Sequence, residues 1–153
     1  SIVYRYFTDK AHLQRTLGRS ILSTMHRKLL RELKALESDM GREPDADERI
    51  HAMIRAYVET AQRSPGVYRF VTRPSDGLSH FLEAVARLIT TFLPDQVPAP
   101  QLWAQGAVGF VEGAVDTWMA EQEKHAAGEG PAPISSDQLV THLVTWLMKG
   151  MHA

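Results

Sequence analysis

Two pairs of acidic and imidazole side chains stand at helical spacing in this sequence. Glu48-x-x-His51 and His80-x-x-Glu83 each place a carboxylate and an imidazole on one helix face, where they can ligate a metal. A di-iron helical bundle needs two Glu-x-x-His motifs and two further glutamates, and only one pair has that order. We therefore interpret Glu48 as part of a solvated face and predict no metal site, no cofactor and no catalytic residue. A bundle enzyme with Glu48 or His51 as a metal ligand is the alternative.

A second polar group lies in a later segment that carries little charge. Its members, Gln105, Gly109, Glu112 and Asp116, fall on one face of a helix. Carboxylates one helical turn apart repel each other unless a nearby cation neutralises them, and the repulsion is stronger when they are partly buried. We hypothesise that Glu112 lies at the polar edge of a cavity, paired with an arginine or facing a ligand donor; simple exposure is the alternative. The candidate arginines are Arg55, Arg69, Arg73 and Arg87.

The start of the chain combines aromatic residues with helix-capping residues. Residues 3–13 read VYRYFTDKAHL, with two tyrosines two positions apart and then Thr8 and Asp9 as side-chain acceptors. Acceptors immediately before an apolar helical pattern are typical of a helix N-terminus. Lys10 follows in the first turn, where the helix dipole disfavours a cation, so we expect it to point outward at an anion.

Helical periodicity continues along the whole chain, and no segment shows the sustained alternation of a strand. The sequence predicts an all-α fold of about six helices. We expect long helices at residues 9–38, 46–63, 76–93, 101–125 and 137–151, and a turn or two at 67–71. At about 1.5 Å per residue the first helix would be about 45 Å long, enough to link one end of the molecule to a distant core.

Composition and charge fit a single globular domain. The 153 residues are 44% hydrophobic and 23% charged, and the absence of cysteine excludes disulfides and thiolate catalysis. It also fits the reducing cytoplasm, where we expect the protein. No apolar run is long enough to cross a bilayer, so we expect no membrane partner.

The net charge of −1 is divided unevenly along the chain. Residues 1–42 hold 9 Lys and Arg against 4 Asp and Glu, and residues 43–153 hold 8 against 14. A basic end on an acidic body favours attraction to a phosphate polymer. The alternative is an ordinary solvated helix face, which is how we interpret Arg27, Lys28, Arg31 and Lys34.

The last two long helices have more apolar surface than one core requires. Residues 102–111 carry no formal charge, and each nearby glycine costs a helix up to about 1 kcal/mol relative to alanine. Close approach of a neighbour explains such glycines better. We predict a homodimer whose four-helix bundle takes these two helices from each copy, with a ligand or the internal core as alternatives. The predicted interface residues are Gly106, Gly113, Leu139, Leu143, Trp146 and Leu147.

The stretch VYRYFTDKAHL resembles the junction, in tetracycline-repressor (TetR) family regulators, between the DNA-reading helix and the long connecting helix. The resemblance implies that residues 1–8 are the tail of an N-terminal helix-turn-helix domain whose remainder is absent. Residues 9–153 would then form the ligand-binding and dimerisation domain. It also assigns DNA-backbone contacts to Tyr4, Tyr6 and Lys10, with packing of Tyr4 against the long helix as the alternative.

The same resemblance implies a ligand-responsive transcriptional regulator, most often a repressor, that releases its DNA operator when a small molecule binds in the helical core. We expect a largely apolar effector. The predicted cavity residues are Met25, Tyr57, Phe70, Phe81, Val85, Leu88, Trp103, Phe110 and, at the edge, Glu112. An ordinary core has the same composition. The rival class is a helical small-molecule carrier with no role on DNA.

Overall fold

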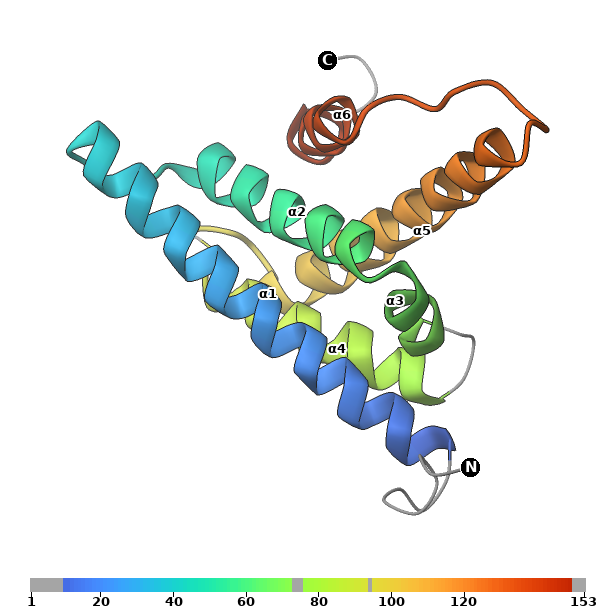
Figure 1. Ribbon diagram of the computed structural model, residues 1–153. Coiled ribbons are helices and arrows are strands. Elements are labelled where there is room, and N and C mark those ends of the chain that lie inside the picture. The colour runs from blue at the N-terminus through green and yellow to red at the C-terminus, as the bar shows by residue number, and fades with distance from the viewer. Residues whose placement is uncertain (1–9, 73–75, 94, 150–153) are drawn as a thin grey trace.

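The computed structural model of the chain describes residues 10–72, 76–93 and 95–149, and their side chains apart from those of 76–80. These residues form six helices and no strand, which confirms the predicted all-α fold (Figure 1). The helices are α1 Lys10–Met40, α2 Ala46–Arg63, α3 Pro65–Val71, α4 Asp76–Thr90, α5 Pro100–Ala126 and α6 Ser136–Lys149. The predicted helix–turn–helix tail at residues 1–8, with Tyr4 and Tyr6, lies outside the described residues.

Helix α1 is the longest element and runs along one side of the molecule in Figure 1, with α2 and α4 packed against it. Its 31 residues correspond to roughly 46 Å. The helix ends at Gly41, whose positive φ of 66° suits a residue without a side chain, and whose amide donates to the Glu37 carbonyl at 2.9 Å. One rigid element therefore connects the two ends of the fold.

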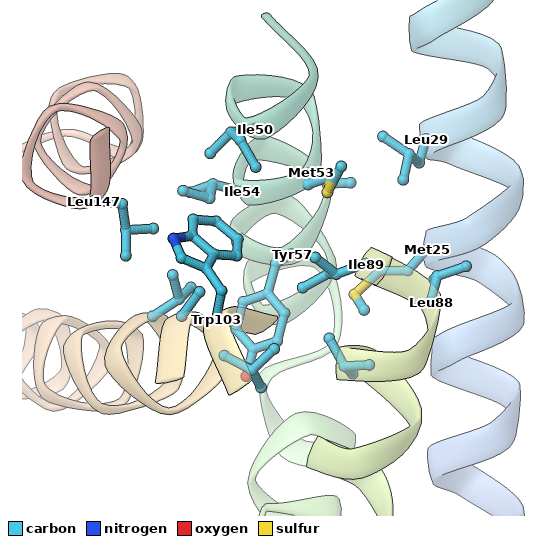
Figure 2. Close-up of a pocket in the computed structure, with 15 residues that line it drawn as sticks. Met25, Leu29, Ile50, Met53, Ile54, Tyr57, Leu88, Ile89, Trp103 and Leu147 are labelled. Carbon is cyan, nitrogen blue, oxygen red and sulfur yellow. The ribbon is translucent and has the colours of Figure 1, made fainter. Parts of the chain in front are cut away.

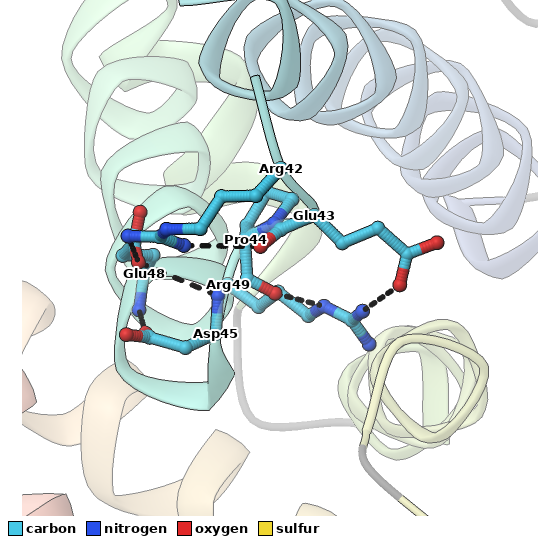
Figure 3. Close-up of polar contacts among 6 residues, drawn as sticks. All are labelled: Arg42, Glu43, Pro44, Asp45, Glu48 and Arg49. Atoms are coloured by element: carbon cyan, nitrogen blue, oxygen red, sulfur yellow. Dashed lines mark hydrogen bonds and ion pairs between the residues drawn. The ribbon is translucent and has the colours of Figure 1, made fainter. Parts of the chain in front are cut away.

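Helix α2 begins with a capping box (Figure 3). The Asp45 carboxylate accepts the Glu48 amide at 2.8 Å, and the Glu48 side chain accepts the Asp45 amide at 3.4 Å. Arg42 adds an ion pair to Glu48 at 2.9 Å, while the Arg49 guanidinium donates to the Pro44 carbonyl at 3.1 Å. These contacts fix the turn between α1 and α2. They also explain Glu48 as a capping residue.

At the N-terminal end of α1 the most buried residues are not the leucines that stand there at helical spacing. Leu13 and Leu17 are half-buried, whereas Gln14 and Gly18 are buried. The Gln14 amide donates to the carbonyls of Phe70 and Val71 at 3.1 and 3.0 Å, satisfying the C-terminal end of α3. A polar residue is thus buried because it closes that helix end.

Helix α2 is the centre of the core and contacts α1, α3, α5 and α6. Eight of its side chains are buried, including Val58 and Ala61, which are fully inaccessible. Helix α6 packs on α2 and is seen end-on in Figure 1, beyond the loop that follows α5. The Trp118 indole N–H ties that loop to α5 by donating to the Ile134 carbonyl at 2.8 Å.

The structure places three of the predicted interface residues of α6 at least partly inside the chain. Leu139 and Leu143 are buried, at 5% and 0% exposure. Leu147 is half-buried beside the cavity described below. Burial of Leu139 and Leu143 follows from the packing of α6 on α2, which covers one apolar face of α6. None of the described helices is long and apolar enough to span a bilayer.

Candidate ligand-binding cavity

An apolar cavity of about 50 Å³ lies between α1, α2, α4, α5 and α6 (Figure 2). Among the described residues no charged side chain lines it, and Tyr57 and Trp103 are the only lining residues with a polar tip. In the close-up Met25 and Leu29 extend from α1 on one side, while Trp103 lies on the other with Leu147 beside it. The remaining lining residues are Ile50, Met53, Ile54, Ala56, Val85, Leu88, Ile89, Ala107, Val108 and Val111.

Five of the nine residues predicted from the sequence line this cavity. They are Met25, Tyr57, Val85, Leu88 and Trp103. The structure brings them together from four helices because each lies on the inward face of its own helix. Ile50, Met53 and Ile54 of α2 were missed, although the amphipathic pattern of that helix already placed them on the same face as Tyr57.

Three further residues of the predicted set, Phe70, Phe81 and Phe110, do not line this cavity. Phe81 is buried in a different place, against Gly18 of α1, whose backbone lets the ring approach closely. Phe70 is half-buried in α3. Phe110 is 42% exposed and packs edge-to-face on Trp146 of α6, with ring centroids 6.3 Å apart. Aromatic character alone did not reveal which ring faces the cavity.

The two buried tyrosines next to the cavity form a hydrogen-bonded pair. The hydroxyl oxygens of Tyr57 and Tyr68 are 2.7 Å apart, and the rings meet edge-to-face. Burial raises the pKa of both hydroxyls, so both are neutral at physiological pH. The cavity wall at Tyr57 is therefore uncharged, and the Tyr57 hydroxyl already has a protein partner.

Glu112 is half-buried on α5 but does not line the cavity. Desolvation by burial, and secondly the charge of Asp116, raise the pKa of its carboxyl. Its charge also acts on Tyr57 and Tyr68, so it lies near that pair. Among the described residues no arginine forms an ion pair with Glu112. Arg69 pairs instead with Glu123, and Arg73 lies outside the described residues.

A face of α5 is left without a partner inside the chain. Gly106, Gly109 and Gly113 are exposed, and a Cβ atom built on any of them meets nothing within 4 Å. Large apolar side chains border this stripe, with Leu102 at 75% and Trp146 at 45% exposure. The His142 ring stacks on Trp146 at 5.3 Å. The part of the chain that the structure describes thus supplies no close neighbour for these glycines.

Two further residues that the sequence analysis singled out, Lys10 and Glu48, do not line the cavity. Lys10 is exposed at the first residue of α1, as expected of a side chain that points into solvent. Glu48 is engaged by its cap and by Arg42, and burial lowers the pKa of His51. No group of three potential metal ligands exists within the described part of the chain.

The chain is similar to two proteins of Mycobacterium tuberculosis, from strains CDC 1551 / Oshkosh and ATCC 25618 / H37Rv. Each is named an uncharacterized HTH-type transcriptional regulator, and each is 28% identical to this chain over 155 aligned positions. The similarity covers 94% of this chain and 59% of each relative, so the chain spans about three fifths of their length. No protein-family model matches the chain.

Proposed function

We propose that this chain is the effector-binding and dimerisation body of a TetR-like transcriptional regulator. The observation that carries the proposal is the uncharged cavity, which the long helix α1 helps to wall through Met25 and Leu29. Sequence similarity over nearly the whole chain to two HTH-type transcriptional regulators also supports the proposal. A helix-turn-helix domain ahead of α1 would bind the operator, and Lys10 would contact the phosphate backbone. We expect the protein to act in the cytoplasm.

The effector is a neutral, mostly apolar small molecule. No charged group of the described residues lines the cavity, and the Tyr57 hydroxyl is already bonded to Tyr68. A charged ligand would therefore lose its hydration without gaining a partner. The cavity of about 50 Å³ is smaller than such a ligand, so binding requires the cavity to expand, and the flexible side chains of Met25 and Met53 allow its wall to do so.

Effector binding changes DNA affinity by moving α1. A ligand in the cavity lies between α1 and the Val85–Ile89 segment of α4, so it displaces the middle of α1 relative to α4. Because α1 is one continuous helix, the displacement alters the position of the head at its N-terminal end. The ligand must bind one arrangement more tightly than the other, typically by about 1–3 kcal/mol. We expect release of the operator, and hence repression in the ligand-free state.

The dimer forms through the exposed stripe of α5 and the neighbouring surface of α6. The stripe has small residues that allow close helix approach, flanked by Leu102, Phe110 and Trp146. The proposed interface includes Gly106, Gly113 and Trp146, whereas Leu139 and Leu143 are buried within the subunit.

The DNA role is tested with the full-length polypeptide. Genomic fragments are selected by the purified protein, and binding of the enriched duplex is measured by fluorescence anisotropy. We expect an inverted-repeat site, because a twofold dimer presents two identical heads. Failure to enrich any sequence, together with retained binding of apolar ligands, would favour the carrier function instead.

The cavity is tested with the neutral fluorophore 1-aminoanthracene. Its emission should rise on binding to the wild-type protein. Ala107→Phe, which fills the cavity, should weaken binding by about tenfold or more, whereas Ala35→Phe on the exposed side of α1 should not. Circular dichroism and Tm show whether both variants are folded. Equal binding by the two variants would place the fluorophore elsewhere.

A further inference from the structure

A second hollow, a groove of about 200 Å³, lies between α1 and α4 and shares no residue with the apolar cavity. Arg15 and Arg19 of α1 and Arg87 of α4 line it. Apolar contacts come from Leu22, Phe81 and Ala84. The groove thus combines three guanidinium groups with an apolar surface.

Close packing of the two helices forms the floor of this groove. At Gly18 an added Cβ would lie 3.4 Å from Val71 of α3 and 3.5 Å from Phe81 of α4, which is ordinary van der Waals contact, so both side chains pack on the surface of α1 here. The Gln14 amide bonds to the end of α3 and fixes the adjoining turn. The arginines of the groove therefore lie on helices that pack against each other.

The three arginines lack acidic partners among the described residues. Lys28, Arg42, Arg49 and Arg69 all form ion pairs with glutamates, but Arg15, Arg19 and Arg87 form none. Glu83 precedes Arg87 by one helical turn and remains exposed without pairing to it. None of the described residues that line the groove is acidic. Three arginines that line one groove thus have no acidic partner on the described part of the chain.

We propose that this groove binds a small amphiphilic anion, with its phosphate or carboxylate on Arg15, Arg19 and Arg87 and its apolar portion on Leu22, Phe81 and Ala84. Guanidinium groups suit these anions because their planar N–H donors form paired, charge-assisted hydrogen bonds. The neutral cavity cannot take such a ligand, so the two hollows select opposite chemistries. A ligand that bridges α1 and α4 here would also hold α1 in place.

The binding experiment uses octyl phosphate and isothermal titration calorimetry. The variant Arg15→Gln/Arg19→Gln/Arg87→Gln should bind about tenfold or more weakly than wild type. The matched control, Arg27→Gln/Arg31→Gln/Lys34→Gln, removes three exposed positive charges from α1 outside the groove and should change affinity less than about twofold. Equal losses in the two variants would overturn the proposal, because the effect would then be one of net charge.

Simpler ligands separate the two parts of the site. Octanol lacks the anion and inorganic phosphate lacks the chain, so we expect both to bind more weakly than octyl phosphate. Any octanol binding should be equal in both triple variants. Ala84→Glu places a carboxylate on the groove and should abolish octyl phosphate binding, which provides a second variant if the triple variant does not fold.

Other polyanions define the contrary outcomes. Binding of phosphatidylglycerol vesicles or of duplex DNA by wild type, lost in the groove variant while octyl phosphate does not bind at all, would overturn the small-ligand site. Increasing NaCl should weaken octyl phosphate binding to wild type, because exposed charges are screened. These readouts need no operator, so they can fail or succeed independently of the proposed regulation of DNA binding.

Discussion

The hydroxyl oxygens of Tyr57 and Tyr68 lie 2.7 Å apart in the core, joining α2 to α3. Tyr68 is 2% exposed and Tyr57 is 5% exposed, so solvent cannot replace either partner. The Tyr57 ring lines the apolar cavity, while its polar tip is satisfied away from any ligand. Because the two hydroxyls bond to each other, the cavity wall stays neutral although two tyrosines are buried beside it.

Removing one hydroxyl of this pair should destabilise the fold. Tyr57→Phe leaves the Tyr68 hydroxyl buried without its partner, which costs about 1–3 kcal/mol of unfolding free energy. Tyr57→Phe/Tyr68→Phe removes both polar atoms and should recover part of that loss. Urea unfolding followed by circular dichroism measures both variants. A double variant much less stable than the single one would show that the hydroxyls have other essential partners.

The same pair should limit stability at alkaline pH. Burial raises the pKa of both tyrosines above the ordinary value of 10.0, so the folded state holds these protons more tightly than the unfolded state. Their contribution to stability is therefore complete below pH 10 and is lost as pH rises toward the raised pKa. Between pH 9 and about 11 the Tm of wild type should fall more steeply than that of the double phenylalanine variant. If the Tm of the two proteins fell equally with pH, this explanation would be contradicted.

Glu112→Gln should stabilise the protein at neutral pH. Burial and Asp116 raise the pKa of Glu112 above 4.5, so its favourable contribution is present below pH 4.5 and is lost as pH rises. The gain at pH 7 should be only a few tenths of a kcal/mol, since the side chain is partly solvated, and should disappear near pH 4. Thermal unfolding of Glu112→Gln and of Glu121→Gln, an exposed control on α5, tests this. An unchanged Tm at pH 7 and unchanged 1-aminoanthracene affinity would also remove Glu112 from any effector site.

The glycines of α5 should show opposite effects on folding and on association. Gly109→Ala/Gly113→Ala adds methyl groups that meet nothing inside the chain, so helix propensity should stabilise each subunit by up to about 1 kcal/mol per site. The same methyl groups should weaken a dimer in which helices approach closely at this stripe. Analytical ultracentrifugation over a dilution series, with urea unfolding at low concentration, measures the two effects. An unaltered dimer, or a monomeric wild type, would exclude this face as the interface.

The capping box of α2 should depend on pH through Asp45. Hydrogen bonds from the Glu48 backbone, the largest cause, lower the pKa of Asp45 below 3.8. The cap therefore contributes above pH 3.8 and is lost as pH falls through the lowered value. Asp45→Ala should reduce the Tm at pH 7 and have less effect near pH 2, whereas Asp45→Asn should retain much of the cap. If the difference in Tm between wild type and Asp45→Ala did not change with pH, the charge of Asp45 would not contribute to the cap.

The sequence by itself determined the local structure of this protein. Apolar residues at spacings of three and four, interrupted by Gly41, Pro65 and Pro94, define where helices form and end, because these signals act within a few residues of the chain. The same periodicity placed Met25, Tyr57 and the other three predicted residues that line the cavity on apolar helix faces, and the family resemblance suggested a cavity there. Each occupies the inward face of an amphipathic helix.

Only the tertiary structure decided which apolar surface is covered, and by what. Helix α6 could bury Leu139 and Leu143 against α2 or against a second copy, and their sequence spacing is identical in both cases. Gln14 is buried because the end of α3 offers it two carbonyls from residues 56 and 57 positions away. Arg15, Arg19 and Arg87 likewise form one groove only because α1 and α4 pack closely at Gly18. Periodicity assigns a residue to a face of its helix, whereas the partner of that face depends on contacts between segments far apart in the chain.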